Sequence, residues 1–136
     1  FRLVIQVFIL RSIQIRMANG HQIDIQAFQE EVQNMIGTIQ YFENLPPEEP
    51  LAFDSGFETS KNKAENYINQ PTIKQRICEA ITSINNDLFE INRTITPVLV
   101  GAILAETIVM PLNPIIFAWI VLLVSRAGIK QYCNAD

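Results

Sequence analysis

Apolar residues recur along much of the chain at the spacing of amphipathic helices. Between residues 24 and 44, and again between 71 and 95, the steps alternate between three and four, which is the heptad pattern of one helix face. The two series are Ile25, Phe28, Val32, Met35, Ile39 and Phe42, and then Ile77, Ile81, Ile84, Leu88, Ile91 and Ile95. The pattern predicts an all-α fold in which two long helices pack as an antiparallel hairpin through these seams.

Polar residues and prolines predict where these helices begin and end. Asp24 is placed to cap the first helix, and the chain leaves the helix before Pro46, because a residue preceding proline avoids the α region. Pro71 suits the first turn of the second helix, where its missing N–H costs nothing. Residues 46–58 are rich in proline and acids and are expected as a loop. We expect residues 46–70 to connect the two helices, with a short helix at 60–69.

From residue 97 the alternation gives way to a continuous apolar block, Pro97–Ser125. As one straight helix it measures about 43 Å, which exceeds a bilayer core of about 30 Å. The Pro-Leu-Asn-Pro run at 111–114 divides the block, with Asn113 placed to cap the second limb and Pro114 to begin its first turn. Three arrangements follow: one kinked membrane span, a re-entrant membrane hairpin, or two helices buried in the core of a soluble fold.

Glu106, Pro111 and Pro114 are the candidate functional residues. Glu106 is the one charged residue of the block, and a carboxylate within hydrocarbon is costly and usually faces protein or water. It is expected either to line a pore or pair between subunits, or else to be protonated or lie where the first limb reaches the membrane surface. Pro111 and Pro114 set the bend between the limbs.

Residues 1–22 are expected to form a leader that is strand-like or disordered. The apolar run Leu3–Leu10 resembles the core of a secretory signal, but Arg11 and Arg16 follow it where such signals are uncharged. Beyond the run, apolar and polar residues alternate as in a strand. The chain is thus divided into the leader, a helical hairpin at 23–96, the apolar segment 97–125 and a polar tail at 126–136.

Charge is scarce and unevenly distributed. Charged residues make up 18% of the chain, against about a quarter in average proteins, which favours a membrane protein or an unusually buried core. Residues 17–60 carry eight acids and no Lys or Arg, so this half repels phosphate and no nucleic acid partner is expected. Arg126 and Lys130 follow the apolar block, and the basic side of a membrane segment is normally cytoplasmic. The expected location is the membrane, with the bulk of the chain on the cytoplasmic side.

The sequence contains no catalytic, cofactor-binding or metal-binding signature. His21 is the single histidine, and no nucleophile motif or phosphate-binding glycine loop accompanies it. Cys78 and Cys133 form no C-x-x-C pair, which argues against a zinc or iron–sulfur site. So few cysteines do not indicate a disulfide, and they fit a reducing compartment. Asn92-Arg93-Thr94 matches the glycosylation pattern but falls within a predicted helix. We expect no enzyme and no cofactor.

The expected function is that of a membrane-associated helical module for interaction or oligomerisation. Residues 97–125 would anchor it in membrane lipid, and helices 24–44 and 71–95 would bind a protein partner or a second copy. One alternative is a membrane-perturbing or pore-forming effector that assembles through its coiled-coil helices. The other is a soluble all-α bundle that binds a partner and uses residues 97–125 as its core.

Overall fold

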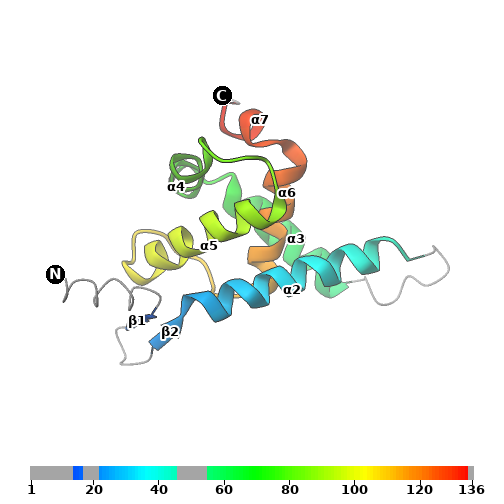
Figure 1. Cartoon of the computed structure of the whole chain (residues 1–136), viewed down its shortest axis with the longest axis horizontal. Helices are drawn as coiled ribbons and strands as arrows, with labels where there is room; N and C mark the ends of the chain where they lie inside the picture. The colour runs from blue at the N-terminus through cyan, green and yellow to red at the C-terminus, as the bar shows by residue number, and fades with distance from the viewer. Residues whose placement is uncertain (1–13, 17–21, 46–54, 135–136) are drawn as a thin grey trace.

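Six helices follow a short antiparallel strand pair in the computed structural model, which describes residues 14–16, 22–45 and 55–134 (Figure 1). The elements are β1 (Gln14–Arg16), β2 (Gln22–Asp24), α2 (Ile25–Glu43), α3 (Ser55–Ile68), α4 (Pro71–Ile81), α5 (Leu88–Leu104), α6 (Pro114–Ala127) and α7 (Ile129–Asn134). In the strand pair Ile15 lies opposite Ile23. The helices pack into a compact bundle, so the predicted all-α class is confirmed. Most of the predicted leader at 1–22 and most of the predicted loop at 46–58 lie outside the described residues.

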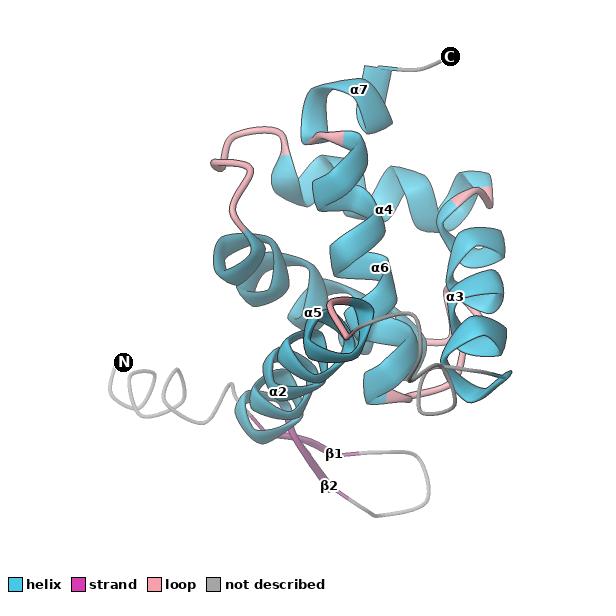
Figure 2. Ribbon diagram, turned by 90° about the vertical axis from the view of Figure 1, so that its right-hand side faces the viewer, coloured by secondary structure: helices cyan, strands magenta, loops and turns pink. Residues whose placement is uncertain are grey.

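The core of the bundle is built around α6. This helix contacts α2, α3, α5 and α7, and Figure 2 shows it running between α3 and α5. Eight of its residues are buried, and Trp119 is 0% exposed. Phe117 meets Phe28 of α2 edge-to-face, with 4.9 Å between ring centroids. Each such side chain stabilises the fold by roughly 1.5–3 kcal/mol before entropy is subtracted. The second limb of the apolar block therefore has protein on all sides.

Residues 97–104 of the first limb lie within α5, which begins before Pro97 and continues through it, and the remainder of the limb leaves the helix. Its inner side chains Leu99, Val100 and Ala102 belong to the same buried cluster. None of the helices in the described part of the chain combines the length and the apolar character needed to cross a bilayer. Residues 97–104 and 114–125 thus contribute helical side chains to the buried core of the bundle.

The second predicted long helix, 71–95, is in fact two helices. α4 ends at Ile81 and α5 begins at Leu88. The Asp87 side chain fixes the start of α5 by accepting a hydrogen bond from the Glu90 N–H at 3.0 Å. The heptad spacing passes through this break by way of Ile84 and Leu88, both half-buried. The fold is therefore not a hairpin of two long helices: α2 packs on α5 and α6, while α4 packs on α5.

Helix starts agree with the expected caps. The Asp24 carboxylate accepts from the Ala27 N–H at 3.1 Å, and the Asn113 side chain accepts from the Ile115 N–H at 2.8 Å. Pro71 and Pro114 each lie in the first turn of their helices. α3 begins at Ser55, earlier than the short helix expected at 60–69. The predicted starts of α2, α4 and α6 are correct because the residues that favour a helix start lie within its first turn.

One buried polar cluster connects α5 to α2. Asn92 and Thr96 are both 0% exposed. The Asn92 amide donates to the Gln29 carbonyl at 3.1 Å and to Gln33 Oε1 at 2.9 Å, and its oxygen accepts from the Thr96 hydroxyl at 2.6 Å. The amide of Asn92 is therefore enclosed in the folded chain and is not accessible for glycosylation, despite the matching tripeptide.

Arg126 connects the end of α6 to the end of α2. Its guanidinium donates two hydrogen bonds to the Glu43 carboxylate, at 2.6 and 3.1 Å. It also lies 5.9 Å from the centroid of the Trp119 ring. The bidentate geometry is the strong form of such a pair. Arg126, which was expected to flank a membrane segment, thus pairs with α2 at one end of the bundle.

Candidate functional site

The three candidate residues lie in or beside the connection between α5 and α6, residues 105–113, which we call the 105–113 turn. Glu106 and Pro111 are exposed within it, and Pro114 begins α6 and is half-buried. The structure thus brings Glu106 and Pro111 into one irregular segment between the limbs. Their functional role stays a prediction.

Glu106 occupies a backbone position that favours glycine. Its φ angle is 63°, the left-handed region in which a side chain is disfavoured. The Glu106 N–H donates to the Ile103 carbonyl at 3.0 Å, and the Thr107 N–H donates to the Ala102 carbonyl at 2.9 Å. This pair of bonds is the Schellman ending of a helix. The Thr107 hydroxyl donates to the same Ala102 carbonyl, so the start of the turn is firmly hydrogen-bonded.

Val109 is the most exposed large apolar side chain in the described part of the chain, at 86%. Its two neighbours, Ile108 and Met110, are each only 6% exposed and belong to the core cluster. Two buried anchors therefore hold the backbone and direct Val109 outward. Together with Ile103 and Glu106, these residues line a shallow, open hollow of about 470 Å³, in which Glu106 is the one charged side chain.

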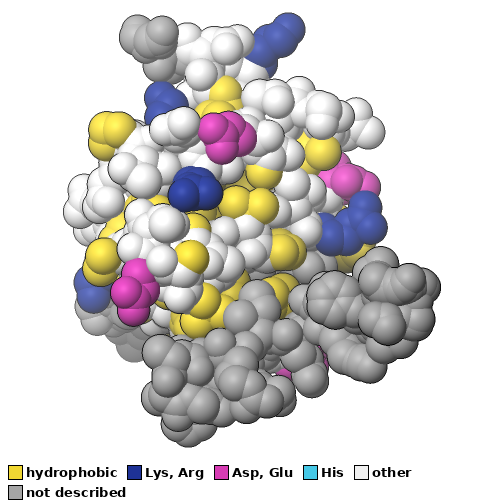
Figure 3. Space-filling view, turned by 90° about the vertical axis from the view of Figure 1, so that its left-hand side faces the viewer, with side chains coloured by type: hydrophobic (Ala, Val, Ile, Leu, Met, Phe, Trp, Pro, Cys, Tyr) yellow, Lys and Arg dark blue, Asp and Glu magenta, His cyan; other side chains and the backbone are white. Residues whose placement is uncertain are grey.

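Val109 is not the only apolar side chain at the surface of the described part of the chain. Figure 3 shows apolar side chains reaching the surface in several places on one face, with polar and charged side chains between them. Phe89, at the first turn of α5, is 51% exposed and lies at the opposite end of that helix from the 105–113 turn. Val109 differs from Phe89 because both of its sequence neighbours are anchored in the core.

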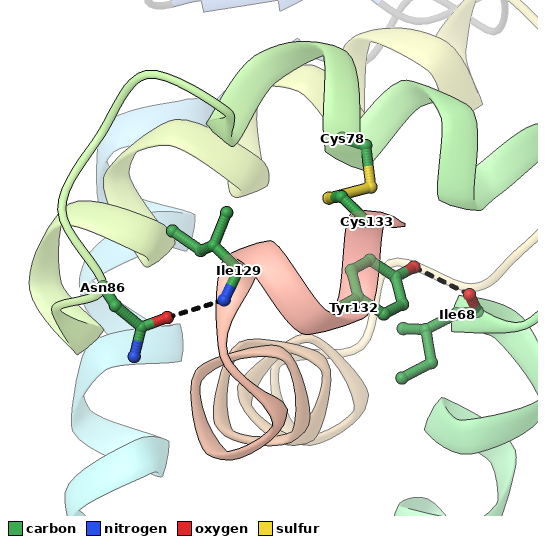
Figure 4. Close-up of a disulfide and its surroundings, with 6 residues drawn as sticks. All are labelled: Ile68, Cys78, Asn86, Ile129, Tyr132 and Cys133. Atoms are coloured by element: carbon green, nitrogen blue, oxygen red, sulfur yellow. Dashed lines mark hydrogen bonds between the residues drawn. A yellow bond between two sulfur atoms is a disulfide. The ribbon is translucent and has the colours of Figure 1, made fainter. Parts of the chain in front are cut away.

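A second region of interest is α7 at the C-terminal end of the described chain. Cys133 of α7 forms a disulfide with Cys78 of α4, with 5.7 Å between their Cα atoms (Figure 4). The sequence allowed this disulfide but did not indicate it, and the fit to a reducing compartment that two unpaired thiols would give is lost. The chain reverses at Gly128, whose φ angle is 91°, and this brings α7 back onto α4. Nothing in the spacing of two cysteines indicates such a reversal.

Two further interactions hold α7 in place. The buried Tyr132 hydroxyl donates to the Ile68 carbonyl at 2.7 Å, and burial raises the pKa of this phenol above its ordinary value. The Asn86 side chain donates to the Ser125 carbonyl at 3.1 Å and accepts from the Ile129 N–H at 2.9 Å. Asn86 thus bridges the end of α6 and the start of α7, and Figure 4 shows its hydrogen bond with Ile129.

A partly open hollow of about 500 Å³ lies beside α7; we call it the α7 hollow. Its walls come from the connection between α4 and α5 and from α7 itself, and include Thr82, Ile84, Asn86, Ile129, Lys130 and Cys133. Sequence reasoning missed this region entirely, because it depends on the docking of α7.

The described residues contain no group of three or more His, Cys, Asp or Glu side chains that could hold a metal ion. His21 lies outside the described residues. No protein-family model, curated protein or solved structure matches this chain.

Proposed function

We propose that this protein is a disulfide-linked helical bundle that binds a protein partner through the 105–113 turn. The observation that carries the proposal is Val109, 86% exposed between two neighbours that are each 6% exposed. An apolar side chain presented on an ordered backbone loses little conformational entropy on binding, which favours its use as an anchor in an interface.

The partner that fits this turn has an apolar pocket with basic residues at its rim. Val109 would enter the pocket, and the adjacent carboxylate of Glu106 would face the rim. The whole chain carries a formal net charge of -4, which adds long-range attraction toward a basic surface.

The membrane-anchored module expected from the sequence has less support. Its proposed anchor includes α6, whose apolar residues Ile116–Leu122 are buried among the other helices. Partner binding through the seams of helices 24–44 and 71–95 also has less support. Val32, Ile39, Ile77 and Ile95 are each 0% exposed within the single chain, so a partner could reach them only after the bundle opened.

The Cys78–Cys133 disulfide supports an oxidising compartment as the place of function. Disulfides form and persist in secreted, lumenal or periplasmic proteins and are rare in a reducing cytosol. A mobility difference between reduced and unreduced samples, taken directly from the source and alkylated on lysis, would support this location. Two thiols that are fully alkylated without reductant would contradict it.

Photo-cross-linking from position 109 tests the partner proposal. Val109 is replaced by p-benzoylphenylalanine in the source cells, and Phe89 is replaced in the same way as a matched control on another exposed apolar position. A defined protein adduct is expected from position 109 and not from position 89. Equal adducts from both positions, or none from 109, would contradict the proposal.

The captured protein is then purified and its affinity is measured directly. Val109→Asp should weaken binding by about tenfold or more, as for an interface anchor worth at least 1.4 kcal/mol. Phe89→Asp should leave the affinity unchanged. Because Val109 is exposed, its substitution should change stability by less than about 0.5 kcal/mol, so lost binding would not reflect unfolding. Equal affinities for Val109→Asp and wild type would refute the role of the turn, and a dimer adduct would identify a second copy as the occupant.

A further inference from the structure

The α7 hollow has walls that are held in place without any ligand. The disulfide fixes α7 to α4, and the Tyr132 hydroxyl fixes it to the end of α3. Asn86, itself a lining residue, is held by hydrogen bonds to the backbone of Ser125 and Ile129. A cavity whose walls are already ordered avoids the entropic cost of forming on binding.

The size and lining of the hollow resemble those of small-molecule sites. Its volume of about 500 Å³ falls within the range of roughly 300–1,000 Å³ that is usual for such sites. Ile84, Ile129 and Cys133 are apolar residues of the lining, and Thr82 and Asn86 are polar ones. The combination of an apolar interior and a few polar groups favours a ligand with an apolar body.

The charge of the lining indicates which polar group the ligand carries. Lys130 is the one charged residue of its lining, and it is exposed. Its ammonium group favours an anion over a cation at the open side of the hollow.

We infer that the α7 hollow binds a small, free organic anion that has an apolar chain or ring. The apolar body lies against Ile84 and Ile129, and the anionic group lies at the open side near Lys130. This site is separate from the 105–113 turn and does not depend on the partner proposed there.

The test uses the full, oxidised chain and three probes: octanoate, octylammonium and acetate. Binding is followed through the methyl signals of Ile84 and Ile129 by NMR, with the core methyl of Ile39 as an internal control. Octanoate is expected to shift the first two methyls and leave Ile39 unchanged. Octylammonium, which has the same chain length and the opposite charge, should bind about fivefold more weakly, as expected for an exposed ion pair. Acetate should cause no shift.

Lys130→Glu and the matched control Lys63→Glu separate a local charge effect from a change in net charge. Both lysines are exposed, so both variants should fold. Lys130→Glu should reverse the preference between octanoate and octylammonium, and Lys63→Glu should preserve it. The inference is overturned if octanoate shifts neither methyl or shifts Ile39 as strongly. It is also overturned if both probes bind equally, or if Lys130→Glu leaves the preference unchanged.

Discussion

Removal of the Cys78–Cys133 disulfide should cost this bundle a large part of its stability. The two cysteines are separated by 55 positions in the sequence, so the bond removes much of the freedom of the unfolded chain. For a closed loop of that length, chain entropy predicts a loss of about 4 kcal/mol when the bond is absent. A domain of this size has a total unfolding free energy of about 5–15 kcal/mol. The double variant Cys78→Ser/Cys133→Ser should therefore still fold, but with a much smaller margin.

Urea unfolding measures this loss. Trp119 is the only tryptophan of the chain and is 0% exposed, so its fluorescence reports on the core, while far-UV circular dichroism reports on the helices. With a slope of about 2 kcal/mol per molar urea, the midpoint should fall by about 2 M. Dithiothreitol should shift the wild type by the same amount and leave the double variant unchanged.

A loss below about 1 kcal/mol in the double variant would refute the reasoning. It would mean that the disulfide between α4 and α7 does not lower the conformational entropy of the unfolded chain as much as its loop length predicts. A shift of the double variant in dithiothreitol would show that the reductant acts on something other than the disulfide.

Three further perturbations test individual features. Glu106→Gly should raise the free energy of unfolding by about 1 kcal/mol, because glycine adopts the left-handed conformation without steric strain. Glu106→Ala should change it by less than about 0.5 kcal/mol. Equal effects of the two substitutions would show that the backbone at this position is not strained. Asn92→Ala should destabilise by roughly 2–4 kcal/mol, because the Thr96 hydroxyl loses its buried acceptor, whereas the exposed control Asn62→Ala should be nearly neutral; a similar loss in both would contradict the buried network. Burial raises the pKa of Tyr132, so its share of stability is present below about pH 10 and is lost at higher pH, where the unfolded chain releases the proton first. Denaturation at several pH values should therefore show a steeper loss above pH 10 in the wild type than in Tyr132→Phe, and parallel curves would count against this cause.

The helix starts could be predicted from the sequence because they depend on neighbouring residues. Asp24, Pro71 and the Asn113-Pro114 pair all lie where their side chains predict. The break between α4 and α5 was missed because apolar spacing continued across it. The polar run Asn85-Asn86-Asp87, which contains the cap of α5, was the signal that could have revealed it.

The environment of the apolar block could not be decided from hydropathy. Lipid and a protein core both accept apolar side chains, and the difference lies in whether distant parts of the chain cover them. In this fold α2 and α3 cover α6, and neither contact is visible in the local pattern of residues 97–125. The Cys78–Cys133 disulfide likewise joins residues 55 positions apart, and local sequence patterns do not indicate it. Glu106 has a positive φ angle at a position where glycine is the usual residue, so its identity gave no warning of the turn.

Sedimentation velocity of the intact, oxidised chain in buffer without detergent tests the central claim most directly. If residues 97–125 are the core of the bundle, the protein should sediment as a single species near its mass of 15.5 kDa. A protein that stays dispersed only in the presence of detergent would contradict the claim, because its apolar block would then require lipid.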